Sequence, residues 1–389
     1  MKNFAIYVGI LLAGFLMFKI NQGEITSVSI LNEIQNSEKT TIANDVVPVA
    51  EEEIDVEADT AETYVEPDPE TLDTHDDADP ITIMAFGDMM LGRYVRTLMD
   101  KYGKDYVFQK IAMGENPFYG EADILFANLE GPIKGTGYKH QTATVFGFHT
   151  DTAAFLKEYG FDVLSIANNH ALDQKADGRD TTIAALEERG IGWCGNVKNV
   201  EEESVYYGEI DDASVAFVCF NDVTYGLYKD QALELIKTVR PKVDYLIVSI
   251  HWGYEYKHTP NNVLQVELGH ALIDAGADFI IGHHPHVVQS FEKYNGKLIF
   301  YSLGNFVFDQ YWSRATQEEL GIKIILDKND DGMETAVELF PMKSEMSQPR
   351  LMTDEEKTKW IKEFLAYGKY DETTVLEVNE GLIKASFEE

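Results

Sequence analysis

Seven short apolar segments most constrain the fold of this 389-residue chain, because each has the length of one buried strand and ends in glycine or polar residues. Segments with helical periodicity separate many of them. Buried strands that alternate with helices are typical of a layered α/β domain, so we expect that fold class. The apolar segments lie at residues 81–88, 122–130, 162–170, 215–222, 243–253, 278–284 and 298–306.

The helical segments between these strands have recognisable ends. Gly190 and Gly276 directly follow two of them, as is common where helices stop. Near the C-terminus, two apolar segments flank residues 328–332 and predict an antiparallel hairpin, followed by a polar helix at about 354–366. The other predicted helices lie at 151–159, 177–189, 229–240 and 263–275.

The first 20 residues contain an unbroken apolar run from Phe4 to Phe18, flanked by Lys2 and Lys19. The run is long for the core of a secretory signal, and short for a membrane-spanning helix unless the lysines extend to the interface. No small-residue cleavage site follows it. We therefore expect an uncleaved signal anchor at residues 1–20, rather than a cleaved signal peptide, with the rest of the chain outside the cell membrane.

The formal net charge of −35 is unevenly distributed. Residues 21–80 hold 18 Asp and Glu and a single lysine, with few aromatic side chains. This composition cannot bury enough apolar area to fold, so we expect a disordered acidic tether. Residues 81–389 carry a charge of −20. Such a balance argues against a nucleic-acid partner and against docking on anionic lipid through charge.

The chain has two cysteines, which are too few for a disulfide framework. Cys219 lies within an apolar run, where a buried structural thiol is favoured over a reactive one. Cys194 lies in a turn. A single bridge between the two is the alternative, and the sequence leaves the choice open.

Polar residues gather where six of the predicted strands end. Because the carboxyl ends of strands in layered α/β folds share one edge, we expect these side chains to converge. Carboxylates, an amide oxygen and several imidazoles suit Zn²⁺, Mn²⁺ or Fe²⁺ better than Ca²⁺ or Mg²⁺. The sequence therefore predicts a divalent metal site. The clusters contain Asp88; Asn128 and Glu130; Asn168, Asn169 and His170; His251 and Glu255; His283, His284 and His286; and Asn305.

The segment GHHPHV refines the choice of ligands. Pro285 is expected to hold the chain extended, so that His284 and His286 project to the same side. We predict that these two histidines form a ligand pair. His283 would then point the other way and serve as a structural histidine with its hydrogen bonds satisfied.

In the segment ANNHALD, the amide oxygen of Asn169 is a candidate ligand. The adjacent His170 is suited to donate a proton, and Asp173 could orient it. The alternative is a helix-capping turn with Asn168 as the cap, which would still leave Asn169 and His170 free to act.

Two further residues are candidates for contact with an anionic ligand. Arg93 follows the first strand and could bind a phosphate or carboxylate, or pair with a neighbouring acid; the sequence supports both equally. Asn305 follows Gly304, at a turn that would bring backbone amides near an anion.

The ordered motifs GDMMLGR, NLEGP, ANNHALD, HWGYE, GHHPHV and YSLGNFVFDQ resemble those of the bacterial poly-γ-glutamate capsule biosynthesis family of the CapA or PgsA type, over about residues 81–312. The resemblance implies a variant of the calcineurin-like metallophosphoesterase fold, a layered β-sandwich flanked by helices. We expect this metallophosphatase-like domain to extend over residues 81–345, with 346–389 as a C-terminal helical extension.

The resemblance also implies roles for individual residues, with His170 as the acid or the anion-contacting histidine. In the related hydrolases the first strand ends in Asp-x-His, whereas Met89 and Met90 follow Asp88 here, and Glu130 stands where a bridging Asp is usual. The missing ligand leaves one or two metal ions per chain as the expectation. The implied ligands are Asp88, Glu130, Asn169, His251, His284 and His286.

Three functions follow as hypotheses. The favoured one is an anchored, extracellular component of poly-γ-glutamate synthesis and export, which works with membrane subunits of a synthase complex on an anionic polymer. The second is a surface metal-dependent phosphoesterase that acts on a phosphate-containing ligand. The third is a scaffold without metal chemistry. Whether the chain is an enzyme stays open at this point.

Overall fold

The structure is a computed structural model and describes residues 79–112, 120, 122–134, 144–329 and 332–385. All of them belong to one of the two units of the chain, Thr74–Glu389. The predicted anchor at 1–20 and nearly all of the predicted tether at 21–80 lie outside the described residues. Within the described part, none of the helices has the length and apolar character that a membrane span requires.

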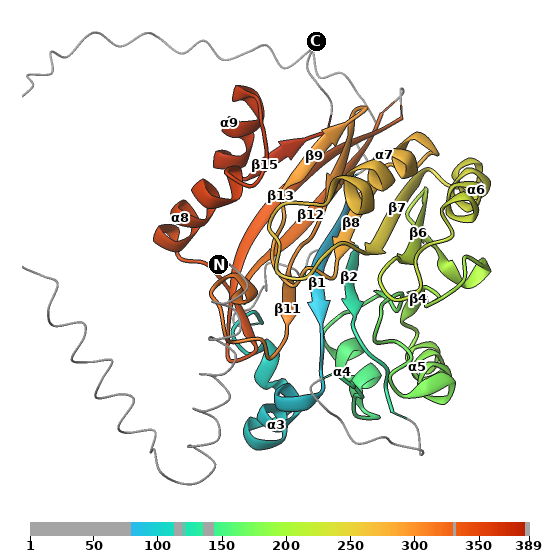
Figure 1. The fold of residues 1–389 in the computed structure, drawn as a ribbon, viewed down its shortest axis with the longest axis vertical. Helices are drawn as coiled ribbons and strands as arrows, with labels where there is room; N and C mark the ends of the chain where they lie inside the picture. Colours follow the sequence, from blue (N-terminus) through green and yellow to red (C-terminus); the bar gives the residue numbers. More distant parts are fainter. Residues whose placement is uncertain (1–78, 113–119, 121, 135–143, 330–331, 386–389) are drawn as a thin grey trace, which may run out of the picture. The chain divides into compact units, whose positions relative to one another are not determined.

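Two β-sheets form the centre of this unit (Figure 1). In the first sheet, β1 pairs in parallel with β2 and antiparallel with β12, and β2, β3 and β4 continue in parallel. Two more strands join beside this path, β11 on β1 and β15 on β13. The order is β14 (Gln348–Leu351), β13 (Gly332–Glu345), β12 (Glu318–Asn329), β1 (Ile81–Met89), β2 (Ile124–Leu129), β3 (Val163–Ser165) and β4 (Gly192–Cys194), with β11 (Asn305–Val307) and β15 (Leu382–Lys384).

The second sheet has a parallel centre of four strands with an antiparallel strand at each edge. Parallel strands must be joined by crossovers, and helices form two of those between these strands. The order is β5 (Val205–Ile210), β6 (Ala213–Asn221), β7 (Tyr245–His251), β8 (Phe279–His283), β10 (Lys297–Phe300) and β9 (Phe291–Tyr294).

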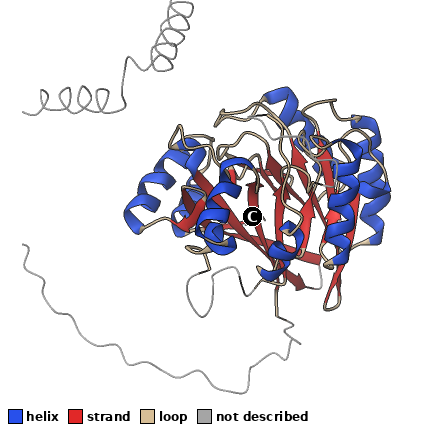
Figure 2. Cartoon of the chain, turned by 90° about the horizontal axis from the view of Figure 1, so that it is seen from below, coloured by secondary structure: helices blue, strands red, loops and turns tan. Residues whose placement is uncertain are grey.

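Helices cover the outer faces of the two sheets, and Figure 2 shows them on either side of the strands. The first sheet packs against α3 (Arg93–Tyr102), α4 (Thr152–Glu158) and α5 (Lys175–Glu188). The second packs against α6 (Lys229–Val239) and α7 (Glu267–Asp274). The helices α8 (Asp354–Leu365) and α9 (Glu372–Glu380) add Trp360, Phe364 and Val378 to the core between the sheets. Short helical turns lie at Lys104–Phe108, Glu202–Ser204, Arg240–Lys242, Asn262–Val266 and Ala315–Gln317.

The apolar runs are continuous because both faces of the central strands are buried. In β1, Ile83 and Ala85 belong to the core between the sheets, whereas Met84 and Phe86 face the helices. Side chains alternate between the faces of a strand, so a strand covered on both sides needs apolar residues at every position. The layered α/β class expected from these runs is confirmed, and so is the β-sandwich flanked by helices that the resemblance implied.

Most of the predicted elements are present. All seven apolar segments form strands, and each of the four predicted helices between them is found within a few residues of its expected ends. The hairpin at 328–332 joins β12 and β13, with Asn329 opposite Gly332. The edge strand β5 and the three-residue strand β4 were not predicted, since β5 is only half-buried and β4 is too short to show a period.

The two cysteines form a disulfide, the alternative that the sequence left open, so Cys219 is not a free thiol. Cys194 ends β4 in the first sheet and Cys219 lies on β6 in the second, and both side chains are fully buried. The bridge therefore joins the two sheets through the core between them.

The C-terminal stretch 346–389 contains more than helices. Its strand β14 pairs with β13, and β15 also pairs with β13 at Ala336–Glu338. The predicted boundary at residue 345 stays a prediction, but the residues after it complete the first sheet.

Gly87 offers a test of how closely the strands approach near the end of β1. A Cβ atom at this residue would lie 2.0 Å from the backbone oxygen of Gly304. Backbone atoms in a paired strand cannot yield easily, so we expect Gly87→Ala to lower the free energy of unfolding by about 2–3 kcal/mol in urea titrations.

Gly269→Ala is the matched control for that substitution. A Cβ at this position of α7 would meet its nearest atom at 3.4 Å, an ordinary contact. Alanine is also the better helix former, so stability should be unchanged or slightly higher. Equal stability of Gly87→Ala and the wild type would show that β1 and the turn before β11 can separate.

Candidate metal centre

The carboxyl ends of strands from both sheets meet at one place. Asp88 lies near the end of β1 and Glu130 directly follows β2, both in the first sheet. His251 ends β7, and His284 follows the last residue of β8, in the second sheet. All four side chains are buried. The convergence of strand ends predicted from the sequence is therefore present.

The first group of metal-binding side chains is Asp88, Glu130 and His251. One ligand atom from each lies within 4.8 Å of the others. None of the three side chains is more than 1% exposed. This spacing allows the three atoms to contact one ion together.

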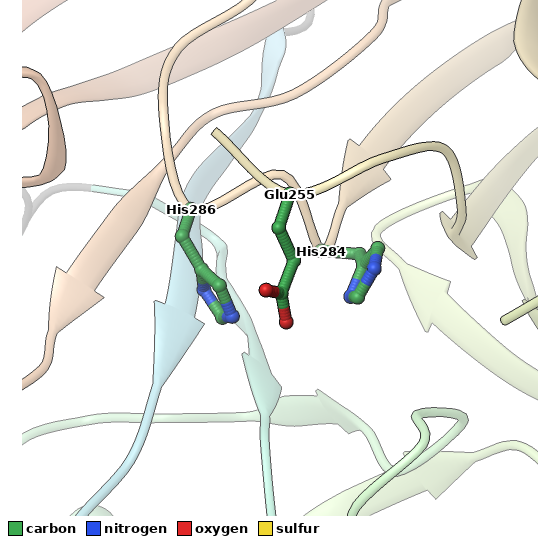
Figure 3. A group of neighbouring side chains, drawn as sticks. All are labelled: Glu255, His284 and His286. Carbon is green, nitrogen blue, oxygen red and sulfur yellow. The ribbon is translucent and has the colours of Figure 1, made fainter. Parts of the chain in front are cut away.

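The second group is Glu255, His284 and His286, again with one ligand atom from each within 4.8 Å of the others. Figure 3 shows the carboxylate of Glu255 between the two imidazole rings. Glu255 is exposed, whereas both histidines are buried. The sequence placed Glu255 in a strand-end cluster but did not assign it as a ligand; its place four residues after His251 was the available signal.

Unpaired polar atoms show that these side chains suit a cation. Both carboxylate oxygens of Glu130, both ring nitrogens of His283 and Nδ1 of His284 are buried without a hydrogen-bond partner among the described residues. A buried charge without a partner is costly, and a divalent cation would compensate it. The donor set of carboxylates and imidazoles fits Mn²⁺, Zn²⁺ or Fe²⁺, which would supply Lewis acidity when bound.

Several groups of the centre contact the carboxylate of Asp88. Its Oδ1 accepts a hydrogen bond from Asn128 Nδ2 at 2.8 Å, and its Oδ2 accepts one from the backbone N–H of His284 at 3.1 Å. Nδ1 of His286 lies 3.4 Å from Oδ2. These contacts hold the carboxylate in one orientation.

Asn169 contacts His251. The amide Oδ1 of Asn169 lies 2.9 Å from Nε2 of His251, so that nitrogen carries the proton. Nδ1 of the same ring faces the amide nitrogen of Asn128 at 3.3 Å. The predicted ligand Asn169 therefore lies within the centre, and its ligation of a metal stays a prediction.

The histidines of the centre differ in their pKa values. Burial lowers the pKa of His284 to about 3 and that of His251 well below its usual value, so both rings are neutral at pH 7. Burial alone would also lower the pKa of His286, but the carboxylates of Glu130 and Asp88 raise it to about 9. His286 must therefore lose a proton before it can bind a metal.

The two buried carboxyl groups shift in opposite directions. Burial raises the pKa of Glu130 well above its usual value. Burial would raise that of Asp88 too, yet the imidazoles of His283 and His286, each 3.4 Å from a carboxylate oxygen, hold it well below the usual range. Asp88 is thus ionised at neutral pH, whereas Glu130 ionises readily only beside a cation, such as protonated His286 at 3.7 Å.

His170 and Asp173 lie together, as their spacing suggested. Nδ1 of His170 lies 2.7 Å from Oδ2 of Asp173, and the ring stacks on Phe146. Nε2 of the same ring lies 3.8 Å from Oε1 of Glu130, so it faces the first group. The acid–base role of His170 stays a prediction.

Asn168 is not a helix cap, contrary to the alternative for its motif. Its Nδ2 donates to the backbone oxygen of Leu129 at 2.9 Å and to Asn128 at 3.2 Å. The helix α5 begins only at Lys175, without a side-chain cap. The buried Asn168 instead ties the loop after β3 to the end of β2.

Arg93 and Asn305, the two residues predicted to contact an anion, both contact other groups of the protein. Arg93 forms an ion pair with Asp309 and lies 4.7 Å from the centre of the Phe146 ring, so the acid pair is formed. Oδ1 of Asn305 lies 3.0 Å from Nδ1 of His286, and its Nδ2 donates to the backbone oxygen of Thr316 at 2.9 Å. We therefore assign Asn305 to positioning His286, and a ligand contact by either residue stays a prediction.

Two expectations about GHHPHV are wrong. The chain is not extended after β8, because His284 and His286 adopt positive φ angles of 95° and 57°. His283 does not point away with its hydrogen bonds satisfied: its Nδ1 lies 3.4 Å from Oδ1 of Asp88. A turn brings all three rings to the centre, and such uncommon backbone angles persist where the surroundings enforce them.

The high pKa of His286 leads to a prediction for metal affinity. Because a metal must displace the proton of His286, binding of Mn²⁺ or Zn²⁺ should weaken by up to tenfold for each pH unit below about 9, and protonation of Glu130 adds to this loss. Calorimetric titration of the full-length chain in two buffers of different ionisation enthalpy would measure both affinity and proton release. Substitution of the exposed His149 by alanine should leave both unchanged, whereas a pH-independent affinity would contradict the assignment of His286.

The chain is similar to a known protein family and to known structures. Residues 82–310 match the family model described as bacterial capsule synthesis protein PGA_cap. Among solved structures, a phosphatase from Mycoplasma pneumoniae is similar with 15% identity and a TM-score of 0.44, over 69% of this chain and 96% of that chain.

Two curated proteins are more similar in sequence. The capsule biosynthesis protein CapA of Bacillus anthracis is 34% identical over 295 residues, which cover 70% of this chain and 69% of that protein. The PGA biosynthesis protein CapA of Bacillus subtilis (strain 168) is 33% identical over 263 residues, with 63% and 68% covered. On the family model and these identities together, the chain belongs to the bacterial capsule synthesis protein family PGA_cap.

Proposed function

We propose that this protein is a membrane-anchored, extracellular component of poly-γ-glutamate synthesis and export, and that its divalent metal centre contacts the anionic polymer. The observation that carries the proposal is the buried carboxylate–imidazole centre, which lies wholly within the residues that match the family. The relatives are named for capsule and PGA biosynthesis.

The centre has one side from which a polymer could approach. Glu255 is exposed, while the other residues of both metal-binding groups are buried. A metal held behind Glu255 would attract carboxylate oxygens of the polymer, which are good ligands for these ions. Because the domain itself is acidic, a polyanion must be drawn by such local contacts rather than by the overall field.

The proposed placement outside the cell rests on two features. The apolar run at 4–18 with its flanking lysines supports an anchor, and the acidic stretch that follows supports export of the rest. The Cys194–Cys219 disulfide also suits an oxidising compartment. Membrane subunits of a synthase complex are the proposed partners.

A second candidate function is a surface metal-dependent phosphoesterase. The observation in its favour is His170, which Asp173 orients toward Glu130 and hence toward a metal. A histidine held in this way could donate a proton to a leaving group. The same contact is also compatible with simple anion binding.

The role of the centre can be tested with Glu130→Gln, which keeps the shape of the side chain but removes its charge. In a host strain that lacks its own CapA relative, we expect the variant to lower the amount of poly-γ-glutamate to roughly a tenth or less of the wild-type level, because loss of a charged ligand weakens metal binding strongly. Quantification of the extracted polymer, with an immunoblot for equal protein, measures this.

His149→Ala is the control, since this histidine is exposed and pairs only with Asp151 among the groups described here. Normal polymer from Glu130→Gln would sink the proposed role of the centre. Turnover of p-nitrophenyl phosphate or its diester by the metal-loaded wild type, lost in His170→Ala while polymer production stays normal, would favour the phosphoesterase instead.

The proposed placement predicts that a protease added to intact cells removes a C-terminal epitope of the chain. The tether and the domain should be accessible from outside, whereas a cytoplasmic marker protein stays intact. Digestion of the epitope only after cell lysis would overturn the placement without bearing on the metal centre.

A further inference from the structure

Two hollows adjoin each other beside the metal centre. The first, of about 720 Å³, is lined by Tyr254, Tyr256 and the residues up to Asn262. The second, of about 560 Å³, is lined on one side by residues 290–293 and on the other by residues 366–371. Thr259, Pro260 and Asn262 line both, so the two hollows adjoin along this segment, and together they are called the groove.

The groove begins at the exposed side of the metal centre. Glu255 lies between Tyr254 and Tyr256 in the chain, and the ring of Tyr256 lies 6.1 Å from that of His286. The side chains of Tyr254 and Tyr256 are 57% and 42% exposed, so they offer apolar walls to a ligand. Tyr254 and Tyr256 thus place one end of the groove next to Glu255, which itself lines neither hollow.

The other end of the groove is formed by the C-terminal extension, beyond the residues that match the family. Contacts of His258 hold this extension against the loop that follows Glu255. The ring of His258 in the first hollow stacks on Tyr367 of the second at 4.3 Å. Nδ1 of His258 also lies 2.8 Å from the backbone oxygen of Val288. The two parts of the groove are thus held together through one side chain.

Most charged side chains in the groove have partners, but two lysines form no ion pair with a described residue. Glu292 is bound by His270 and Tyr301, and Lys293 pairs with Glu377. Asp371 accepts the backbone N–H of Thr374 at the start of α9. In contrast, Lys257 and Lys369, one in each hollow, are exposed and form no ion pair with any described residue.

The junction between the hollows presents polar groups on either side of Pro260. Thr259 and Asn262 are both exposed there, and their side chains form no hydrogen bond with a described residue. The amide of Asn262 can donate and accept, which suits the secondary amides of a peptide-like chain. Carboxylates on that chain would suit the two lysines.

We propose that this groove binds an extended segment of a γ-linked polyglutamate chain, with Lys257 and Lys369 on successive parts of the polymer and the metal centre at one end. The inference rests on the proposed function and names the surface that holds its substrate. On a domain with a charge of −20, two unpaired lysines in one groove are a local complement to a polyanion. The C-terminal extension then determines how much of the polymer is held.

The test uses the full-length chain with Mn²⁺ and compares binding of long γ-linked polyglutamate, short γ-linked oligomers and free glutamate by calorimetry. We expect affinity to rise with polymer length. Charge reversal of both lysines, Lys257→Glu with Lys369→Glu, should weaken binding of the long polymer by about tenfold or more, since each lost contact is exposed and contributes modestly.

Lys359→Glu is the matched control, because this exposed lysine of α8 lines neither hollow. It makes the same charge change as either of the two lysine substitutions alone and should alter affinity by less than about twofold. Thermal unfolding of each variant would show that the exposed substitutions leave the fold intact.

Two results would contradict the proposal that the groove binds the polymer. One is a double variant that binds the long polymer as tightly as the wild type, and the other is an affinity that does not depend on length. If polymer production in cells still requires Glu130 in either case, the proposed function stands and only the groove is wrong. If polymer production does not require the protein at all, the proposed function itself fails.

Discussion

The carboxylate of Asp88 is the group on which the arrangement of this centre depends. It is fully buried and ionised, and it contacts Asn128, the backbone of His284 and the rings of His283 and His286. A charge removed from water must be compensated by neighbouring groups, so the segments that supply those groups cannot move independently. Strands of both sheets are therefore tied to one side chain.

This constraint also accounts for the unusual backbone nearby. Gly87, next to Asp88, lies so close to Gly304 that no side chain fits, and Asp88 pairs with Asn305 in the neighbouring strand. Asn305 in turn holds His286, whose positive φ would be unfavourable in isolation. The unfavourable φ of His286 is tolerated because the hydrogen bonds around this residue hold its ring in one orientation.

Two parts of the chain supply the candidate metal centre and one wall of the groove. The residues that match the family supply the side chains of the candidate metal centre, which lie at or just after strand ends. The C-terminal extension adds strands to the first sheet, helices at the core between the sheets, and one wall of the groove. The candidate metal centre and this wall of the groove thus come from different parts of the chain.

The sequence by itself determined the layered α/β class, most strands and helices, and which strand ends carry Asp88, Glu130, His251 and His284, because buried strands and their polar ends leave a local pattern. It could not assign Glu255, the inward turn of His283, or the Cys194–Cys219 bridge. Those depend on which segments pack together across two sheets, and on backbone angles that only the surrounding contacts make favourable. Packing between distant segments leaves no local period, so only the tertiary structure decided them.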